Sequence, residues 1–223
     1  MKAKKLKFNK NLSFQGVIPN AKGFVLSFEE AERIITQNPK NKKCLKIFMV
    51  GKDLNQGWTW SGSRMIIDFQ DWSLEKALEY KECFEIVKNK VKPQRDSMQT
   101  STGIAKKIQK YWWQFGAICP QMRESLKPLK QFVVIARVSK YRLFTMIDNQ
   151  NIIPDQRLCV FASSSFSFLG ILSSKLHIVW AKYQGSKLED RLCYTNTTCF
   201  ETFPFPCKLK GILFPLNTDL GFL

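Results

Sequence analysis

The chain has 223 residues, of which 44% are hydrophobic, and this suffices for one large domain or two small ones with a buried core. Its 35 Lys and Arg against 18 Asp and Glu give a formal net charge of +17, which favours a polyanionic partner: DNA, RNA or an anionic membrane surface. No basic amphipathic helix, signal-peptide core or membrane-spanning run accompanies this charge. We therefore predict a cytoplasmic protein without a membrane partner.

The cysteine and histidine content argues against a metal site. The seven cysteines form no C-x-x-C pair, and with His177 as the single histidine the usual zinc ligand sets cannot be assembled from close neighbours. The sequence also lacks a Gly-rich phosphate loop, an H-E-x-x-H motif and a G-x-S-x-G motif. We expect reduced, mostly buried thiols, a packed His177, no catalytic residue and no metal ligand.

The first half of the chain predicts a basic tail followed by alternating strands and helices. Residues 1–12 carry five lysines. Ser27 and Glu30 have the spacing of a capping box and predict a helix that stops before Pro39. Apolar residues at intervals of three and four predict one long helix from Ser73 to Val91, ended by Pro93, with a loop at 94–103. Strands are expected at residues 13–17, 23–27, 45–50 and 65–69.

The final third is rich in β-forming residues. A short helix can begin at Ser173. No internal repeat and no clear linker interrupts residues 13–206, so we predict one α+β domain there, with mixed or antiparallel sheets, a long helix, a helical insertion and a C-terminal tail at 207–223. The aromatic and proline residues of 200–206 predict either an edge strand or a rigid support for recognition residues. Strands are expected at 132–138, 143–147, 158–162 and 166–169.

Three polar clusters at expected turns or strand ends carry side chains that can read base edges. Arg pairs with guanine, Glu or Asp accepts from the cytosine amine, and Ser, Asn or Gln serve adenine or mixed roles. The alternative for each cluster is a solvated loop. The clusters are Ser139, Lys140, Tyr141 and Arg142; Ser163, Ser164 and Ser165; and Lys187, Glu189, Asp190 and Arg191.

Other cations are expected to contact phosphates rather than bases. Lys106, Lys107 and Lys110 precede an aromatic run that contains Trp112 and Trp113, and Arg137 lies at the end of an expected strand. A run of lysines can also be only a solvated helix face. The two tryptophans are interpreted as core residues, with one of them exposed.

Nine short strings, in this order and at this approximate spacing, resemble the target recognition region of MmeI-like type II restriction-modification enzymes. They are FQGV at 14–17, GFVLS at 23–27, GKDL at 51–54, IDF at 67–69, VKPQR at 91–95, WWQF at 112–115, RVSK at 137–140, LSS at 172–174 with His177 and Trp180, and FETFPFP at 200–206. The resemblance covers about residues 13–206.

The resemblance implies a sequence-specific double-stranded DNA-binding domain without catalytic residues. In such enzymes an endonuclease, an adenine methyltransferase and a target recognition domain share one chain that uses S-adenosylmethionine and a divalent metal. Those cofactors would belong to the domains that are missing here, and a methyltransferase or endonuclease chain would be a further partner. Glu189 and Arg191 are the foremost expected base readers. The alternatives are a divergent complete methyltransferase or nuclease, and an RNA-binding module.

Overall fold

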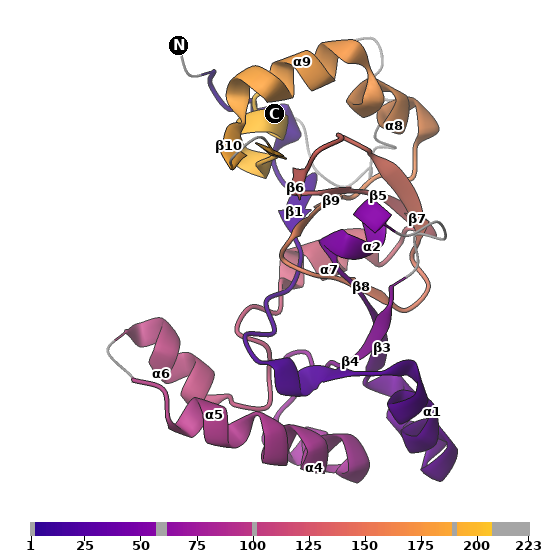
Figure 1. Ribbon diagram of the computed structural model, residues 1–223, viewed down its shortest axis with the longest axis vertical. Helices are drawn as coiled ribbons and strands as arrows, with labels where there is room; N and C mark the ends of the chain where they lie inside the picture. Colours follow the sequence, from indigo (N-terminus) through magenta and orange to yellow (C-terminus); the bar gives the residue numbers. More distant parts are fainter. Residues whose placement is uncertain (1–2, 57–61, 100–101, 189–190, 207–223) are drawn as a thin grey trace, which may run out of the picture.

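Two adjacent strands at the centre of the molecule, β5 (Gln131–Ala136) and β9 (Leu158–Phe161), are buried on both faces. Successive side chains of a strand point to opposite faces. Phe132 and Val134 accordingly join one hydrophobic core, while Val133 and Ile135 join a second. The computed structural model describes residues 3–56, 62–99, 102–188 and 191–206. Figure 1 shows the central strands between a helical cap, formed by the helices at Phe166–Ser173 and Lys175–Gln184, above and a second sheet with its helices below.

Within the described residues, three sheets build the α+β fold, which confirms the predicted class. The central sheet has the order β1-β9-β5-β7 and is antiparallel, with β1 at Ser13–Gln15 and β7 at Thr145–Asp148. The lower sheet has the order β2-β4-β3-β8, and its β3–β8 pair is parallel. Its strands are β2 (Val25–Leu26), β3 (Leu45–Met49), β4 (Arg64–Ile67) and β8 (Ile152–Pro154).

The third sheet is small and has the order β10-β11-β6. Its strands are β10 (Ser186–Leu188), β11 (Arg191–Cys193) and β6 (Val138–Ser139). The helices are α1 (Phe28–Gln37), α2 (Gly51–Gln56), α3 (Leu74–Leu78), α4 (Lys81–Lys90), α5 (Lys92–Asp96), α6 (Gly103–Lys110), α7 (Pro120–Leu126), α8 (Phe166–Ser173) and α9 (Lys175–Gln184).

The capping box predicted at the start of α1 is confirmed. The Ser27 hydroxyl accepts a hydrogen bond from the Glu30 backbone N–H at 3.1 Å, and the Glu30 carboxylate accepts from the Ser27 N–H at 2.8 Å. Such reciprocal bonds satisfy two donors that the first helical turn leaves free. This local signal therefore set the helix start correctly.

The single long helix predicted from Ser73 to Val91 is wrong, because the structure divides the segment at Tyr80. α3 ends at Leu78 and α4 begins at Lys81, while the Tyr80 ring packs 5.0 Å from that of Trp72. Pro93 does not end the helical region either. It occupies the first turn of α5, where its missing N–H has no helical partner to lose.

The strand predicted at 166–169 is also wrong, because these residues begin α8. The Ser165 hydroxyl caps this helix by accepting from the Phe168 N–H at 3.3 Å. Phe168 and Leu172 are buried at helical spacing, whereas Phe166 is exposed. The alternation of Phe166, Ser167 and Phe168 is typical of a strand, but the stretch is too short to distinguish the strand repeat from the helical repeat.

The aromatic residues of 200–206 belong to the second core rather than to an edge strand. A π-helical turn, Asn196–Phe200, precedes them, and Phe200, Phe203 and Phe205 are buried against α8 and α9. His177 is packed in the same core, as predicted, with its ring centre 4.4 Å from that of Phe203. The aromatic cluster thus anchors the helical cap to the central sheet.

Further predictions concern thiols, tryptophans and membrane spans. All six cysteines in the described part of the chain are free, and Cys207 lies outside it. Trp113 is buried and donates its indole N–H to the Trp72 carbonyl at 2.9 Å, while Trp112 is partly exposed. Within the described ranges, no helix has the length and apolar character needed to cross a bilayer.

Candidate nucleic-acid interface

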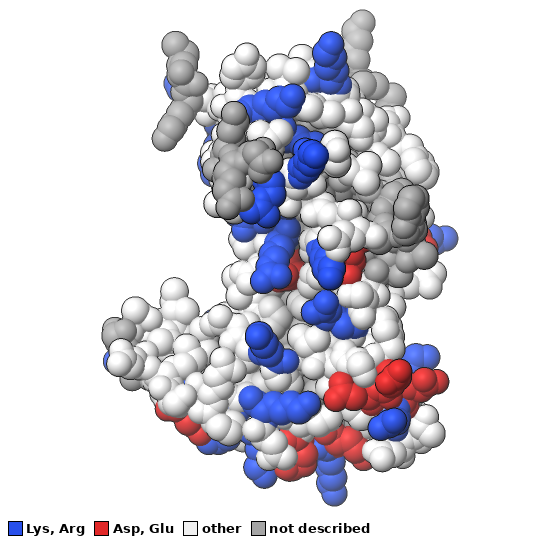
Figure 2. Space-filling view, in the orientation of Figure 1, with Lys and Arg blue, Asp and Glu red and all other residues white. Residues whose placement is uncertain are grey.

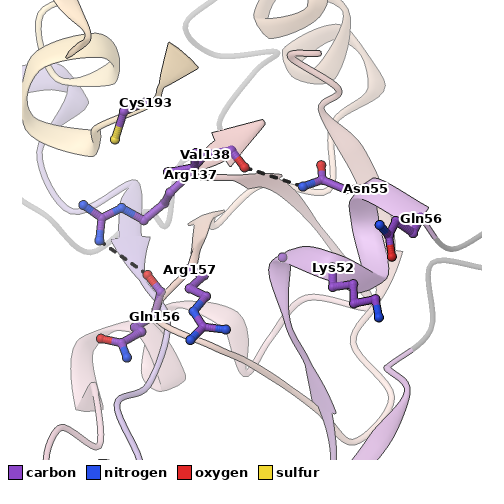
Figure 3. A pocket seen from close by; sticks show the side chains of 9 residues that line it. Lys52, Asn55, Gln56, Arg137, Val138, Gln156, Arg157 and Cys193 are labelled. Atoms are coloured by element: carbon purple, nitrogen blue, oxygen red, sulfur yellow. Dashed lines mark hydrogen bonds between the residues drawn. The ribbon is translucent and has the colours of Figure 1, made fainter. Parts of the chain in front are cut away.

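An open pocket of about 580 Å³ lies where α2, the end of β5 and the turn before β9 meet (Figure 3). It combines cationic, amide and thiol side chains from segments that are far apart in the sequence. The residues that line it are Gly51, Lys52, Asn55, Gln56, Arg137, Val138, Gln156, Arg157 and Cys193.

Backbone hydrogen bonds hold the turn before β9 in place beneath this pocket. The Asp155 N–H donates to the Met49 carbonyl at 2.8 Å, and the Gln156 N–H donates to the Val17 carbonyl at 2.9 Å. Gly16 permits this approach, because a Cβ there would lie 2.3 Å from the carbonyl oxygens of Pro154 and Asp155. The turn is therefore a fixed support for Gln156 and Arg157.

Arg137 is the junction between the pocket and the small sheet. Its N–H donates to the Arg157 carbonyl at 2.8 Å, and its carbonyl accepts from the Tyr194 N–H at 2.7 Å. Its guanidinium lies 3.5 Å from the Gln156 carbonyl oxygen. Arg137 therefore links two sides of the pocket, one that contains Arg157 and one that contains Cys193.

The pocket is strongly basic. It is lined by Lys52, Arg137 and Arg157, and none of its described lining residues is acidic. Asp155 lies beneath it, 3.8 Å from the Arg157 Nε, and its burial raises the pKa of that carboxyl group. Since the Arg157 side chain is 75% exposed, its charge faces solvent. Figure 2 shows Lys and Arg spread over the whole length of this face, whereas most Asp and Glu lie at its lower end.

The small sheet brings together two of the three predicted base-reading clusters. β6 pairs with β11 so that Ser139 lies opposite Leu192, and β11 begins at Arg191. The first cluster therefore lies beside the hairpin that carries the third. Arg191 is exposed. Glu189, Asp190 and the side chain of Lys187 lie outside the described residues.

Within the first cluster the side chains have different surroundings. The Ser139 hydroxyl donates to the Asn55 Oδ1 at 2.9 Å. Lys140 is exposed and its Nζ lies 5.6 Å from the ring centre of Tyr141, which is 72% exposed. Arg142 instead turns towards α9, where its Nη2 donates to the Ala181 carbonyl at 3.3 Å, and burial lowers its pKa. Base reading by these residues stays a prediction.

The second cluster is not brought to the same place. β9 runs antiparallel to β5, so Ser163 to Ser165 follow the end of β9 that lies away from Ser139. Ser163 is buried and its hydroxyl accepts from the Ser165 N–H at 3.2 Å, while Ser165 caps α8. Ser164 is exposed. Two of these serines therefore have local structural roles.

The predicted phosphate contacts divide between two places. Arg137 lines the pocket, whereas Lys106, Lys107 and Lys110 are exposed on α6, in a helical arm that projects from the lower part of the molecule (Figure 1). Sequence reasoning missed Lys52, Asn55, Gln156 and Arg157 as site residues. The expected turn at Pro154 and Asp155 could have drawn attention to Gln156 and Arg157, which follow it directly.

Comparison with known proteins identifies the family. The chain matches the family described as MmeI, target recognition domain, over residues 2–207. The chain belongs to this family. The MmeI resemblance found in the sequence is thereby confirmed.

Among solved structures, the Type IIL restriction-modification enzyme MmeI in complex with DNA is similar to this chain. The TM-score is 0.72 at 20% sequence identity, and the match covers 94% of this chain and 28% of that one. At this identity the likeness concerns the fold. The chain thus spans little more than a quarter of the MmeI chain. No curated protein matches the sequence.

Proposed function

We propose that this target recognition domain binds double-stranded DNA and recognises a specific sequence. The observation that carries the proposal is the basic pocket formed by Lys52, Arg137 and Arg157, in a domain of the MmeI target recognition family. A surface that neutralises phosphates gains affinity by releasing counterions, and base-edge contacts then supply specificity. The pocket and the neighbouring small sheet offer both kinds of side chain.

Charge and exposure suggest which side chains contact phosphates and which contact base edges. Lys52, Arg137 and Arg157 contact phosphates and set the register of the duplex. Lys140 and Tyr141, which follow β6, and Arg191, which begins β11, lie next to the pocket and contact base edges. Glu189, which lies outside the described residues, is proposed to contact a base edge as well. Each good base contact contributes about 1–3 kcal/mol of discrimination.

We further propose that this chain has no catalytic role and positions a methyltransferase or endonuclease supplied by another polypeptide. S-adenosylmethionine and a divalent metal would be bound by that partner. Incubation of this chain with plasmid DNA, magnesium and S-adenosylmethionine tests it, because cleavage or methyl transfer by the chain alone would overturn the non-catalytic reading.

The DNA-binding proposal is tested by removing two pocket charges. Lys52→Ala combined with Arg157→Ala should weaken duplex binding, and should lower the slope of log affinity against log salt by about 2, because each lost phosphate contact contributes about 0.9. Binding is measured by fluorescence anisotropy over a range of salt concentrations. The matched control is Lys81→Ala with Lys88→Ala, which removes the same charge from exposed positions on α4.

The control variant should retain the wild-type slope. Equal slopes for the pocket variant and the control would mean that the pocket is not the DNA-binding site. Tighter binding of single-stranded RNA than of duplex DNA would favour the RNA-binding alternative, for which Tyr111 and Trp112 are stacking candidates.

A further inference from the structure

Asn55 on α2 and Ser139 on β6 form a side-chain pair at the edge of the pocket. The two residues are 84 positions apart, and the Ser139 hydroxyl donates to the Asn55 Oδ1 at 2.9 Å. The same hydroxyl oxygen accepts from the Tyr141 backbone N–H at 3.3 Å. The Ser139 hydroxyl therefore makes two hydrogen bonds, one as donor and one as acceptor, and both fix its position. Ser139 can hold the Asn55 carboxamide still.

The neighbouring carbonyl of Val138 sets which way the Asn55 carboxamide faces. Its oxygen lies 3.5 Å from the Asn55 Nδ2, a contact at the outer limit for a hydrogen bond. Turning the amide by 180° would place the Asn55 oxygen against this carbonyl oxygen, which is electrostatically unfavourable. The amide nitrogen therefore faces the carbonyl of Val138, which lines the pocket (Figure 3). The amide oxygen faces the Ser139 hydroxyl.

We propose that Asn55 determines specificity at one base pair of the DNA target by donating an N–H to a base-edge acceptor in the major groove. This inference rests on the proposed function. Nδ2 carries two N–H groups, of which only one can face Val138, so the second is free to donate towards the pocket. Ser139 acts as a positioning residue, because it holds the amide through the Asn55 oxygen. The basic residues Lys52 and Arg157 line the same pocket and bring the duplex near it.

The chemistry of the grooves turns this geometry into a base preference. Guanine, adenine and thymine each present an acceptor in the major groove, whereas cytosine presents only its amino donor. A fixed N–H donor therefore disfavours cytosine at the position it contacts. A carboxylate in its place can only accept, and should favour cytosine, because the adenine amino group lies beside the N7 acceptor, which repels a carboxylate, whereas the cytosine amino group has no acceptor beside it.

The test replaces the amide by a carboxylate and reads the base preference directly. Wild type and Asn55→Asp are each used to select duplexes from a randomised pool, which is then sequenced. Wild type should disfavour cytosine at one position, and Asn55→Asp should raise the relative selection of cytosine there by about tenfold or more. The matched control is Asn89→Asp, which makes the same change of charge at an exposed position on α4 and should leave the selected sequence unchanged.

A second variant tests the positioning role of Ser139. Ser139→Ala keeps the Asn55 side chain but removes the hydroxyl that positions it. The base preference at the same position should therefore become weaker, without a shift towards cytosine. If Ser139→Ala alters a different position or none, the positioning role is wrong. Thermal unfolding of each variant checks that it remains folded.

The failure of this inference can be distinguished from that of the proposed function. If wild type selects no sequence at all, sequence recognition by this domain is wrong, and the role of Asn55 falls with it. If wild type selects a sequence that Asn55→Asp leaves unchanged, only the role of Asn55 is overturned. Equal loss of binding to every sequence in Asn55→Asp would also overturn it, because a base reader acts at one position.

Discussion

His177 shows at the residue scale how the second core controls a titratable group. Its Nε2 lies 3.0 Å from the Tyr194 hydroxyl, and its ring packs edge-on against Phe203 and near Phe144. Burial, with a smaller contribution from the charge of Arg142, lowers the pKa of His177 to about 3. The imidazole is therefore neutral in the folded protein at neutral pH, as expected of a packing residue.

This lowered pKa predicts a loss of stability in acid. The folded pKa of His177 is about 3 and its ordinary value is 6.5, so the unfolded chain binds a proton first as the pH falls. Stability present above pH 6.5 is then lost towards pH 3, by up to about 1.4 kcal/mol per pH unit from this one group. Wild type should lose stability more steeply than His177→Phe over this window.

Urea unfolding at several pH values between 7 and 3 measures the effect. The carboxylates that titrate in the same range are common to both proteins, so the difference between the two stability curves reports on His177. Curves that stay parallel across the window would show that His177 is not held neutral by the fold.

At the scale of single elements, the start of α8 separates a structural role from a recognition role. Ser165 caps the helix and Ser164, its neighbour, is exposed. Ser165→Ala should lower the free energy of unfolding by about 1 kcal/mol, because the Phe168 N–H loses its acceptor. Ser164→Ala is the matched control and should leave stability within about 0.5 kcal/mol of wild type. Denaturant unfolding measures both, and equal stabilities would contradict the capping role of Ser165.

Elements with a complete local signal could be predicted from the sequence, and those decided by packing could not. Ser27 and Glu30 lie three residues apart, so the start of α1 was evident. The break at Tyr80 depends on its packing against Trp72, and α8 depends on Phe168 and Leu172 reaching a core formed with Phe200 and Phe205. Neither contact leaves a pattern in neighbouring residues.

The same distinction applies to the site. Ser139 and Arg191 could be predicted because each belongs to a polar cluster at an expected turn or strand end, and the pairing of β6 with β11 brings their segments together. Gln156 and Arg157 lie beside Arg137 because the antiparallel β5–β9 pairing continues to them, with the Arg137 N–H donating to the Arg157 carbonyl. Asn55 could not be predicted, because α2 follows β3, whose parallel pairing with β8 places it beside the turn before β9. A parallel pairing between residues about a hundred positions apart depends on the whole fold.

For the molecule as a whole, the helical arm formed by α5 and α6 carries exposed lysines at a distance from the pocket. Figures 1 and 2 show α5 and α6 projecting from the lower body, with a hollow between the arm and the upper part. Arg95 anchors the arm from within: it is fully buried and donates to the Pro19 carbonyl at 2.9 Å and the Gln114 carbonyl at 2.7 Å. Burial lowers its pKa to about 10, so it remains charged at neutral pH. The arm is thereby held in place relative to the rest of the domain.

Lys106, Lys107 and Lys110 are exposed on this fixed arm. We predict that they contribute to DNA affinity but not to sequence specificity. If these lysines contact phosphates, replacing all three by Ala should weaken binding to every duplex and lower the salt slope by about 3, with the selected sequence unchanged. Alanine is a strong helix former, so α6 should persist. Anisotropy titrations on selected and scrambled duplexes measure both quantities.

A charge-matched control distinguishes a loss of phosphate contacts at α6 from a general effect of lower net charge. Lys42, Lys43 and Lys81 are exposed on other elements, and their replacement by Ala removes the same charge. A slope that falls equally in both triple variants would assign the effect to net charge and leave α6 as a solvated helix face. A slope that falls only with the arm lysines would mean that the duplex reaches α6 as well as the pocket, since counterions are released only where phosphates are contacted.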